Sequence, residues 1–541
     1  MSKNSIKSKY SLFFWVFFYL FIFCLLVRFG FSYLDPDLGW HLQVGRETLI
    51  SHQVPITNHY NYTFTGNWVD HEWLSNVLLF KAYEGLGYPV IVFLFALIIV
   101  GVLIGLNLFI KKRAPSISGL VIAGLQLLGV VAALPHLGVR IQELSWLFLF
   151  LILLIIDRYE IKQRPASLLF LLPLMYFWAC LHGSFLIGFF LIFAWIGVKI
   201  VELVAKRYFP TWPIDQSRRL SFKKIAIFGF FGLLTILVTL LTPYRLELYS
   251  FLGGYANTAY LTKIQEWLSQ FFYPFFYWQL FYLALAVLAL LAYLYEAIRH
   301  KLKKINLWAL FLVLVFTVLA FKSRRHFPLM FVATLPFVAT VYGEIIRSLV
   351  VMRKDNPTSN KPRRVYPVWL GFYIFFCLVL AISWQVINIR LVTDPFKYFC
   401  RDYPCGAYEF LNTHPEYQDN NIFNYYGWGG YLIWRLPNKK LFIDGRLPQV
   451  EYAGRTFLEE YTDFYKSDGQ TAERLAKYNI KLVLMPASEP VIKAKRWEQI
   501  LFALPNRPLT GPNYLREYLL SSKAWRLVYY DKTAIIFIKT E

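Results

Sequence analysis

The sequence predicts a polytopic α-helical membrane protein with about eleven spans, a cytoplasmic N-terminus and a C-terminal extracytoplasmic α/β domain. Three observations lead to this prediction. Hydrophobic residues make up 57% of the 541 residues and charged residues only 16%, whereas about a quarter of an ordinary soluble protein is charged. Apolar stretches long enough to cross a bilayer recur along the chain. Clusters of lysine and arginine occupy every second loop between these stretches.

The composition also excludes several classes of protein. So low a charged fraction is not that of a soluble cytosolic enzyme, a disordered protein or a secreted disulfide-stapled module. The net charge of +23 does not indicate a nucleic-acid partner, because the basic residues are interleaved with apolar runs and no groove-reading motif is present.

The first apolar stretch, from Ser11 to Phe29, is longer than the apolar core of a signal peptide, and no small-x-small cleavage site follows it. It therefore predicts an uncleaved membrane anchor. The fifth span is short, and its boundaries are the hardest to place. Ten further spans are expected to start near Tyr88, Ile117, Glu143, Ser167, Phe185, Ile225, Phe276, Leu307, Phe327 and Val365.

The basic clusters set the expected orientation. The positive-inside rule places the clusters and the N-terminus in the cytoplasm, and an odd number of spans then places everything after Gln385 outside. We expect a multi-pass protein of the plasma (inner) membrane. Its parts would be a transmembrane domain at residues 1–387, with a large first outer loop at 31–87, and an extracytoplasmic domain at 388–541. The clusters lie at residues 111–113, 158–164, 206–224, 299–304 and 353–364.

The predicted span interiors are almost free of charge, and polar residues gather at their outer ends. A transporter should instead carry ionisable residues midway through its helices. This distribution favours chemistry at the outer boundary between membrane and water.

Two acids open the first outer loop. Pro36 disfavours helix at Asp35, and Asp37 suits the N-cap of a short interfacial helix that carries His41 and Arg46. Two nearby carboxylates can hold a divalent cation such as Mg²⁺ or Mn²⁺, or one can act as a base while the other stays ionised. A helix cap with a solvated acid explains the same pattern equally well.

A second polar cluster, Asp70-His71-Glu72, lies between tryptophans in the same loop. His71 and Glu72 are adjacent, so they cannot both face one point from a regular helix. An N-cap with a positioning histidine is therefore slightly favoured over a ligand-binding cluster.

Some basic residues lie in short outer loops, where the positive-inside rule does not expect them. They are His136, Arg140, His182, Arg245, Lys322, Arg324, Arg325 and His326. Arginine offers forked donors that suit the pyrophosphate of a lipid carrier. For each residue alone, snorkelling to lipid headgroups is the simpler explanation. For the Arg324-Arg325-His326 run, phosphate binding is favoured.

The C-terminal segment alternates between predicted strands and helices, which indicates a small α/β layer domain. We expect helices at 408–411 and 471–478, strands at 421–425, 440–444 and 481–485, and a hairpin of 526–530 with 534–539. Trp428 and Tyr431 follow the first strand in a glycine-rich turn, and Asp444 and Arg446 follow the second. Strand ends of this kind bind ligands in α/β domains, although a tight turn packed under aromatic residues competes.

The five cysteines fall into two groups. Cys24, Cys180 and Cys377 lie in apolar spans and are expected to be inert. Cys400 and Cys405 lie outside, where they can form a disulfide in an oxidising compartment or stay as free thiols.

The layout of the first loop resembles that of the GT-C glycosyltransferase superfamily, whose members use polyprenyl-phosphate-linked sugars. The resemblance rests on a first span, an outward acidic motif, an interfacial helix and a second amphipathic helix that leads to span two. It implies that Asp35 or Asp37 serves as a catalytic base or metal ligand. It also implies that Arg324 and Arg325 hold the lipid phosphate.

Two further motifs resemble parts of oligosaccharyltransferase catalytic subunits. Ile264-x-Glu266 matches half of a small-Val/Ile-x-Glu motif in a mobile outer loop, but Lys263 replaces the expected Ser or Thr, and a solvated acid is the more conservative interpretation. Trp428 and Tyr431 resemble the WWDYG motif, without its aspartate. Recognition of a Ser/Thr-bearing sequon is therefore not implied.

Three functions are weighed. The first is a transferase that moves sugar from a polyprenyl-phosphate-linked donor to a glycan, lipid or protein acceptor. The alternatives are a polyprenyl-lipid or glycan flippase and a non-enzymatic membrane assembly protein. The first predicts that the acids and arginines line one outward cavity, and it expects the lipid bilayer but no nucleic acid as a partner. Asp35 and Asp37 would be catalytic, and Arg140, Arg324, Arg325 and His326 would bind donor phosphate. The expected substrate-binding residues are His41, Arg46, Asp70, His71, Glu72, His182, Glu266, Trp428, Tyr431, Asp444 and Arg446.

Overall fold

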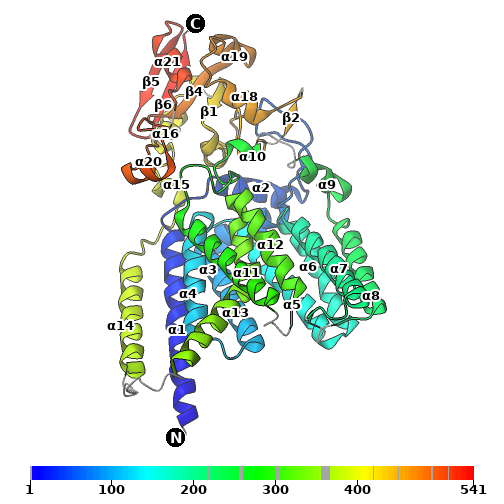
Figure 1. Cartoon of the computed structure of the whole chain (residues 1–541). Coiled ribbons are helices and arrows are strands. Elements are labelled where there is room, and N and C mark those ends of the chain that lie inside the picture. Colours follow the sequence, from blue (N-terminus) through cyan, green and yellow to red (C-terminus); the bar gives the residue numbers. More distant parts are fainter. Residues whose placement is uncertain are drawn as a thin grey trace.

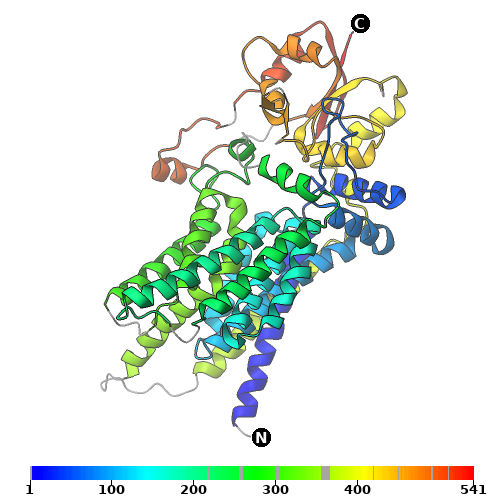
Figure 2. The same cartoon turned by 90° about the vertical axis from the view of Figure 1, so that its right-hand side faces the viewer.

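A computed structural model describes the arrangement of the chain. It describes residues 3–215, 219–254, 260–299, 304–354, 366–417, 419–448, 450–452, 454–488, 492–509 and 511–540. A bundle of long helices occupies one part of the molecule, and a smaller layer of helices and strands lies beyond one end of it (Figure 1). The N-terminus and the C-terminus lie at opposite ends of the molecule, as the view in Figure 2 also shows.

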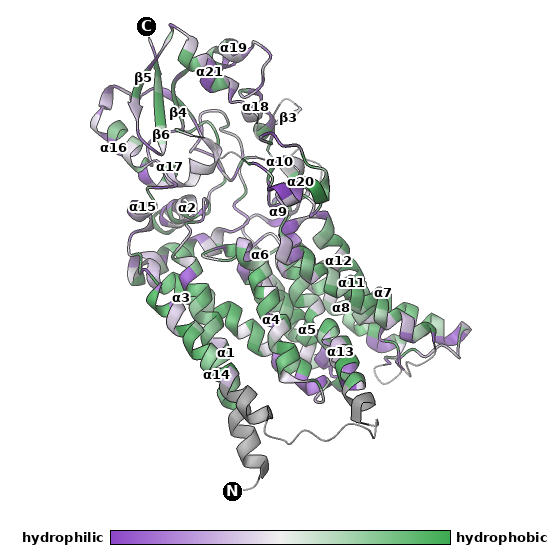
Figure 3. Ribbon diagram, turned by 60° about the vertical axis from the view of Figure 1, so that its left-hand side comes forward, coloured by the Kyte–Doolittle hydropathy of each residue, from purple (hydrophilic) through white to green (hydrophobic). Residues whose placement is uncertain are grey.

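Each of the eleven predicted spans coincides with a helix of the bundle. The apolar residues concentrate in this bundle (Figure 3). The helices are α1 (Lys3–Gly30), α3 (Trp73–Arg113), α4 (Gly119–Ala133), α5 (Leu144–Lys162), α6 (Leu171–Leu181), α7 (Phe185–Tyr208), α8 (Phe222–Thr239), α11 (Tyr277–Ile298), α12 (Leu307–Lys322), α13 (Phe327–Lys354) and α14 (Tyr366–Ile387).

Length and composition support a multi-pass membrane protein. Within the described ranges, 7 helical segments are long and apolar enough to cross a membrane, and the shorter apolar segments lie at Pro165–Leu181, Leu307–Lys322 and Tyr373–Ile387. Helix α5 ends in a charged turn around Asp157 and Glu160. The number of crossings therefore stays a prediction.

The second predicted span follows an amphipathic helical part, and a kink separates the two within α3. Helix α3 runs from Trp73 to Arg113, but Gly87 has φ +80° and Pro89 follows it, so the helix kinks there. A positive φ is a conformation that glycine adopts without a steric penalty. The kink separates the amphipathic first part from the apolar span.

The sequence predicts that helix α2 (Leu38–Ser51) lies free on the membrane surface. The structure instead buries it within the protein. All of its first eight residues are buried, because it packs between α3 and α17 (Gly429–Arg435). A Cβ on Gly39 would lie 2.1 Å from the Gly430 carbonyl oxygen, and one on Gly45 would lie 2.1 Å from the Asn76 carbonyl oxygen. Glycine thus permits backbone contact on both sides of α2, which joins the bundle to the C-terminal segment.

The C-terminal segment forms the expected α/β layer domain, which we call the C-terminal domain (residues 388–541). Its four-stranded sheet has the order β1-β4-β6-β5. Strand β1 pairs with β4 in parallel, and the other pairs are antiparallel. The strands are β1 (Asn421–Asn424), β4 (Ile480–Pro486), β5 (Trp525–Tyr530) and β6 (Ala534–Lys539), with a small β2–β3 ribbon (Glu451–Tyr452 and Arg455–Thr456).

Several helices accompany this sheet, and α18, α19 and α21 contribute residues to its core. Two of the helices, α16 and α19, correspond to the helices predicted at 408–411 and 471–478. The core centres on Phe423, Phe464 and Val483. The helices are α16 (Cys405–Thr413), α18 (Phe457–Asp463), α19 (Thr471–Lys477), α20 (Arg496–Phe502) and α21 (Tyr514–Ser521).

Two local predictions in this domain are wrong. Residues 440–444 form an isolated bridge instead of a strand, because the Leu441 backbone pairs with Tyr60 and Tyr62 of the first loop, whose segment is not a strand. The glycine-rich segment after β1 is also more than a turn, because helix α17 begins at Gly429.

The cysteine pair that the sequence left open is bonded. Cys400 and Cys405 form a disulfide. Cys24 and Cys180 are buried free thiols, whereas Cys377 is an exposed one.

Candidate functional site

A cavity of about 480 Å³ lies where the helix bundle meets the C-terminal domain. The first loop, the ends of several bundle helices and the segment 264–267 all contribute to its wall. It brings together most of the residues that the sequence singled out: Asp35, Asp37, His41, His71, Glu72, Arg140, His182, Glu266, Arg325, His326 and Arg446. The predicted convergence of acids and basic residues on one cavity is therefore observed, apart from Arg324.

Arg140 forms the centre of the charged part of the cavity. Its Nε lies 2.7 Å from Asp35 Oδ2, and its Nη1 donates to Glu266 Oε1 at 2.6 Å. Its Nη2 donates to the Tyr33 hydroxyl at 3.0 Å. The guanidinium joins two acids that lie far apart in the sequence. It is largely buried, and it neutralises the negative charge of these carboxylates where water solvates them poorly.

Asp35 and Asp37 have different surroundings. The Asp37 backbone N–H donates to Asp35 Oδ1 at 2.9 Å, while the Trp40 indole N–H donates to Asp37 Oδ1 at 2.9 Å. Burial raises the pKa of the Asp35 carboxyl to about 6, although Arg140 opposes the rise. Burial also raises the pKa of Asp37. Asp37 precedes α2 as predicted, but its side chain makes no cap hydrogen bond to the helix backbone.

The pKa of Glu266 is lowered, in contrast to those of Asp35 and Asp37, so this carboxyl stays ionised. Burial alone would raise the pKa of this carboxyl, but Arg140 and Arg325 outweigh that effect and hold it at about 2. Arg325 Nη1 lies 3.8 Å from Glu266 Oε2, and its guanidinium also covers the Trp267 ring. About a third of the Arg325 side chain is exposed. This part of the wall therefore presents a cation next to fixed acids.

A second, less charged part of the cavity centres on Glu72. Its carboxylate lies 3.2 Å from His182 Nε2, 3.7 Å from His71 Nε2 and 3.9 Å from His41 Nε2. Burial raises the pKa of Glu72 well above its usual value. Burial lowers the pKa of His41 to about 4 and that of His71 to about 3. The imidazoles of His41 and His71 are therefore neutral at pH 7.

The hydrogen bonds around His182 define its tautomer. The Ser184 backbone N–H donates to His182 Nδ1 at 3.1 Å, so Nδ1 is an acceptor and the ring proton lies on Nε2, facing Glu72. The Ser184 hydroxyl lies 2.6 Å from the same Nδ1, and the Ser145 hydroxyl lies 2.5 Å from that of Ser184. A chain of exchangeable protons thus runs from Glu72 to Ser145 along the cavity wall. Such a chain can hold a hydroxyl-rich ligand or carry a proton.

The structure places three predicted ligand-binding residues away from the cavity. The Arg324 side chain is fully buried, and it donates to the backbone carbonyls of Gln265 and Phe272 instead of facing a phosphate. Arg46 donates to Gln43 Oε1 and covers the Trp434 ring. The buried Asp70 carboxylate accepts hydrogen bonds from Asn76 and from the Glu72 backbone N–H, close to the start of α3.

Three residues of the C-terminal domain that were expected to bind substrate are buried in contacts within the protein. The Trp428 indole donates to the Asp402 carbonyl, and the Tyr431 hydroxyl donates to the Phe396 carbonyl, so neither ring is open for stacking on a ligand. Both rings are packed, as the competing interpretation of their segment expects, although the segment leads into α17 instead of forming a simple turn. Asp444 is fully buried and pairs with Arg446.

Arg446 joins the C-terminal domain to the first loop. Its Nε and Nη2 contact the two Asp444 carboxylate oxygens at 2.8 Å each, and Nη2 also donates to Asn58 and Asn61 of the first loop at 3.2 Å. The guanidinium covers the Trp68 ring. Arg446 therefore borders the cavity mainly as a structural residue.

Several residues of the cavity wall were not among the predicted site residues. They are Tyr33, Trp40, Ser145 and Ser184. His136 also lines the cavity, together with Arg140 of the same short outer loop. The serines carry no signal in the sequence, since single polar residues at helix starts are common caps.

The expected metal site rests on Asp35 and Asp37. In the part of the chain that the structure describes, no three His, Cys, Asp or Glu side chains are arranged to hold a metal ion. Asp35 pairs with Arg140, and Asp37 accepts a hydrogen bond from Trp40. No step below depends on a cation, and its binding stays a prediction.

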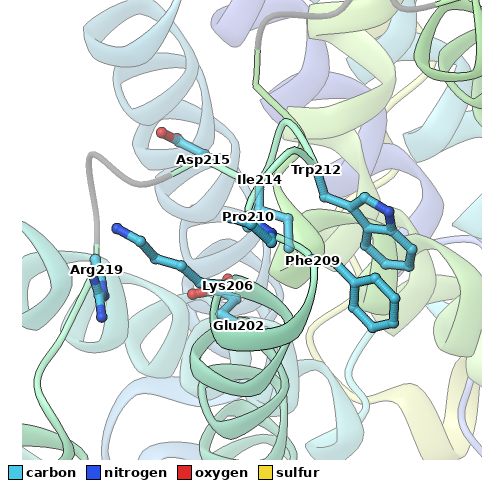
Figure 4. A pocket seen from close by; sticks show the side chains of 8 residues that line it. All are labelled: Glu202, Lys206, Phe209, Pro210, Trp212, Ile214, Asp215 and Arg219. Atoms are coloured by element: carbon cyan, nitrogen blue, oxygen red, sulfur yellow. The ribbon is translucent and has the colours of Figure 1, made fainter.

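A much smaller hollow lies elsewhere, around the C-terminal end of α7 and the segment that follows it (Figure 4). Its volume of about 20 Å³ suits about one water molecule. It is lined by Glu202, Lys206, Phe209, Pro210, Trp212, Ile214, Asp215 and Arg219. This hollow is too small for a sugar or lipid headgroup.

Comparison with known proteins gives a likeness of structure. No family model matches the sequence, and no curated protein matches it. Two solved structures of the oligosaccharyltransferase AglB from Archaeoglobus fulgidus align with 86% of this chain, at 11% and 10% identity and TM-scores of 0.50 and 0.53. The alignments cover 68% and 69% of those chains. One AglB structure has a tethered acceptor peptide with the NVT sequon, and the other has an inhibitory peptide and a dolichol-phosphate. The chain therefore has the fold of an archaeal oligosaccharyltransferase, the GT-C type of fold that its first loop and its spans predicted.

Proposed function

We propose that the protein is a membrane glycosyltransferase that moves a sugar from a polyprenyl-phosphate-linked donor to an acceptor. In this proposal the C-terminal domain lies outside the plasma membrane and the N-terminus lies in the cytoplasm. The acceptor is a glycan, lipid or protein, and the peptide-bound AglB structures favour a peptide among these.

One observation carries the proposal. Asp37, Arg140, Glu266 and Arg325 share a cavity at the end of an apolar helix bundle, where a lipid-linked substrate can present its headgroup. A cation beside fixed acids suits a phosphate leaving group on one side and an acceptor on the other. The dolichol-phosphate in the AglB complex is a ligand of this chemical kind.

The reaction can be written with the residues of this wall. Asp37 accepts the proton of the acceptor nucleophile as that atom attacks the anomeric carbon. The bond between this carbon and the phosphate oxygen breaks, and the bonding electrons leave with the phosphate. Arg325 stabilises the negative charge that the phosphate gains. Arg140 holds Asp35 and Glu266 in place and keeps Glu266 ionised.

The assignment of Asp37, and not Asp35, as the base follows from their contacts. Arg140 pairs directly with Asp35, whereas the one side-chain hydrogen bond to Asp37 comes from the neutral Trp40 indole. Burial raises the pKa of both carboxyls, which suits either to accept a proton, so the contacts and not the pKa distinguish Asp37 from Asp35. The expected Mg²⁺ or Mn²⁺ stays a prediction, which the effect of a chelator on sugar transfer would test.

Replacement of Asp37 tests the function. In cells that lack the gene, the Asp37→Asn variant should restore about 100-fold less glycosylated product than the wild-type protein, the loss typical of a missing general base. Mass spectrometry of surface glycans and glycoproteins measures the product. Asp402→Asn is the matched control, because Asp402 is an exposed acid of the C-terminal domain. Wild-type product from the folded Asp37→Asn protein would rule out the proposed base.

A further inference from the structure

Helix α20 has an exposed apolar face that the C-terminal domain does not cover. Trp497, Ile500 and Leu501 are 48%, 78% and 67% exposed. Their spacing of three and four residues places them on one side of the helix. A soluble domain gains nothing from exposing three large apolar side chains together, so this face indicates an interaction surface.

The buried side of α20 is attached to the helix bundle. Glu498 is almost fully buried and accepts hydrogen bonds from Tyr273 and Tyr277, which flank the start of α11. The Phe502 ring packs on Phe275 with ring centres 4.5 Å apart. These contacts hold α20 beside the end of α11, at the side of the molecule and below the sheet (Figures 1 and 2).

The apolar face of α20 also continues the apolar surface of the bundle. Phe271 and Phe272 are 71% and 58% exposed in the segment before α11, and Trp278 and Phe281 in the first turns of α11 are exposed as well. Farther along α11, exposed leucines extend this surface toward the other end of the helix. A helix in a membrane exposes such side chains to lipid.

Basic residues accompany the apolar face. Lys493, Lys495 and Arg496 precede it directly and are exposed. Basic residues next to Trp, Ile and Leu on a short helix are typical of segments that lie in the headgroup region, where lysine and arginine attract anionic lipids. No acid accompanies them on the exposed side of α20, since Glu498 is buried against the bundle.

We propose that α20 is a membrane-surface anchor of the C-terminal domain. Trp497, Ile500 and Leu501 enter the interface of the adjacent lipid leaflet, and the basic residues contact anionic headgroups. Helix α20 contacts Tyr273, Phe275 and Tyr277, which lie in the segment from Glu266 to the first turn of α11. The lipid surface therefore also steadies the chain that carries this cavity acid. The proposal requires a membrane but does not require sugar transfer.

A spin label at Ile500 tests the proposal in the full chain. The exposed Cys377 is first replaced by Ser, so that the label attaches only at an introduced cysteine. Ile500→Cys and Leu520→Cys are then compared in vesicles of phosphatidylcholine with phosphatidylglycerol. Leu520 is a matched control, because it is 62% exposed on the short helix α21 of the same domain.

The accessibility of the label to dissolved oxygen and to a water-soluble nickel complex gives its depth. We expect the ratio of oxygen to nickel accessibility to be several-fold higher at residue 500 than at residue 520, and to fall when Lys493→Gln and Arg496→Gln are added. Equal ratios at the two sites would overturn the proposal. A label at residue 500 that is shielded from both reagents would overturn it in favour of a protein partner. An unchanged ratio in the basic variant would overturn the role of anionic lipid.

Discussion

Replacing Arg140 by Gln should change the protonation of the cavity. Arg140 contacts Asp35 at 2.7 Å and Glu266 at 2.6 Å. The Glu266 pKa of about 2 lies well below its usual value of 4.5, which corresponds to about 3 kcal/mol. A lowered carboxyl pKa stabilises the folded protein above about pH 4.5, and this contribution is lost as the pH falls toward 2.

At pH 7 the Arg140→Gln variant should therefore be less stable by about 2 to 3 kcal/mol, because Arg140 supplies the larger part of the attraction and Arg325 remains. Asp35 should respond as well. Two charges about 4 Å apart at an effective dielectric constant of about 20 attract by about 4 kcal/mol. Water entering the vacated space weakens this effect, so we expect the pKa of Asp35 to rise from about 6 by about one to three units. The Asp35 carboxyl should then be at least half protonated at pH 7.

Infrared difference spectroscopy can follow the stretching band of the protonated carboxyl during a pH titration. The part of the band that disappears in Asp35→Asn belongs to Asp35. Arg140→Lys keeps the positive charge but loses the forked donors of the guanidinium, so it should shift the Asp35 titration midpoint less than Arg140→Gln does. Arg526→Gln, on an exposed strand residue, is the control for a lost arginine. An Asp35 titration midpoint in Arg140→Gln equal to that of the wild-type protein would refute the electrostatic argument, whatever the effect on activity.

Two further substitutions test how the C-terminal domain meets the cavity. Asp444→Asn should destabilise the protein by about 3 to 5 kcal/mol in a denaturant titration, because it leaves a fully buried guanidinium without its carboxylate. The control Asp468→Asn should show almost no change, because its ion pair is at the surface. Equal losses of stability in the two variants would contradict the argument. A Cβ on Gly445 would lie 2.1 Å from Asp37 Oδ1, so Gly445→Ala should displace that carboxylate and lower product formation by about 10- to 100-fold with little change in Tm. Gly511→Ala, which meets nothing within 4 Å, should leave product formation unchanged, and full activity of Gly445→Ala would exclude Asp37 as the base.

Much of the fold could be predicted because its signals are local. A span needs only an uninterrupted apolar run, and each predicted run forms a helix. The β5–β6 hairpin was predictable from alternation around the turn at Asp531. The segment 440–444 shows the same apolar pattern as a strand, but its hydrogen-bond partners are Tyr60, Tyr62 and Asn424. No short window of sequence contains that information.

The site shows the same division between local and distant causes. Arg324 and Arg325 are chemically identical neighbours, yet a single 3₁₀ turn directs one into backbone contacts and the other to the cavity wall. His71 and Glu72 do meet near one point, because the loop before α3 is not a regular helix. Their third partner, His182, follows α6, so helices α4, α5 and α6 separate it from α3 in the chain. Only the packing of α6 against α3 brings them together.

The position of Asp37 depends on the C-terminal domain as much as on the membrane helices. A Cβ on Gly430 would lie 2.2 Å from the Pro36 carbonyl oxygen, so α17 touches the backbone between the two acids, and Gly445 touches the Asp37 side chain. Arg446 then bonds to Asn58 and Asn61 from the other side. An acceptor bound by the C-terminal domain would therefore be held on the same rigid contact that places the base. For this reason, substitutions on the two sides of the contact should be non-additive, whereas exposed positions far from it should combine additively.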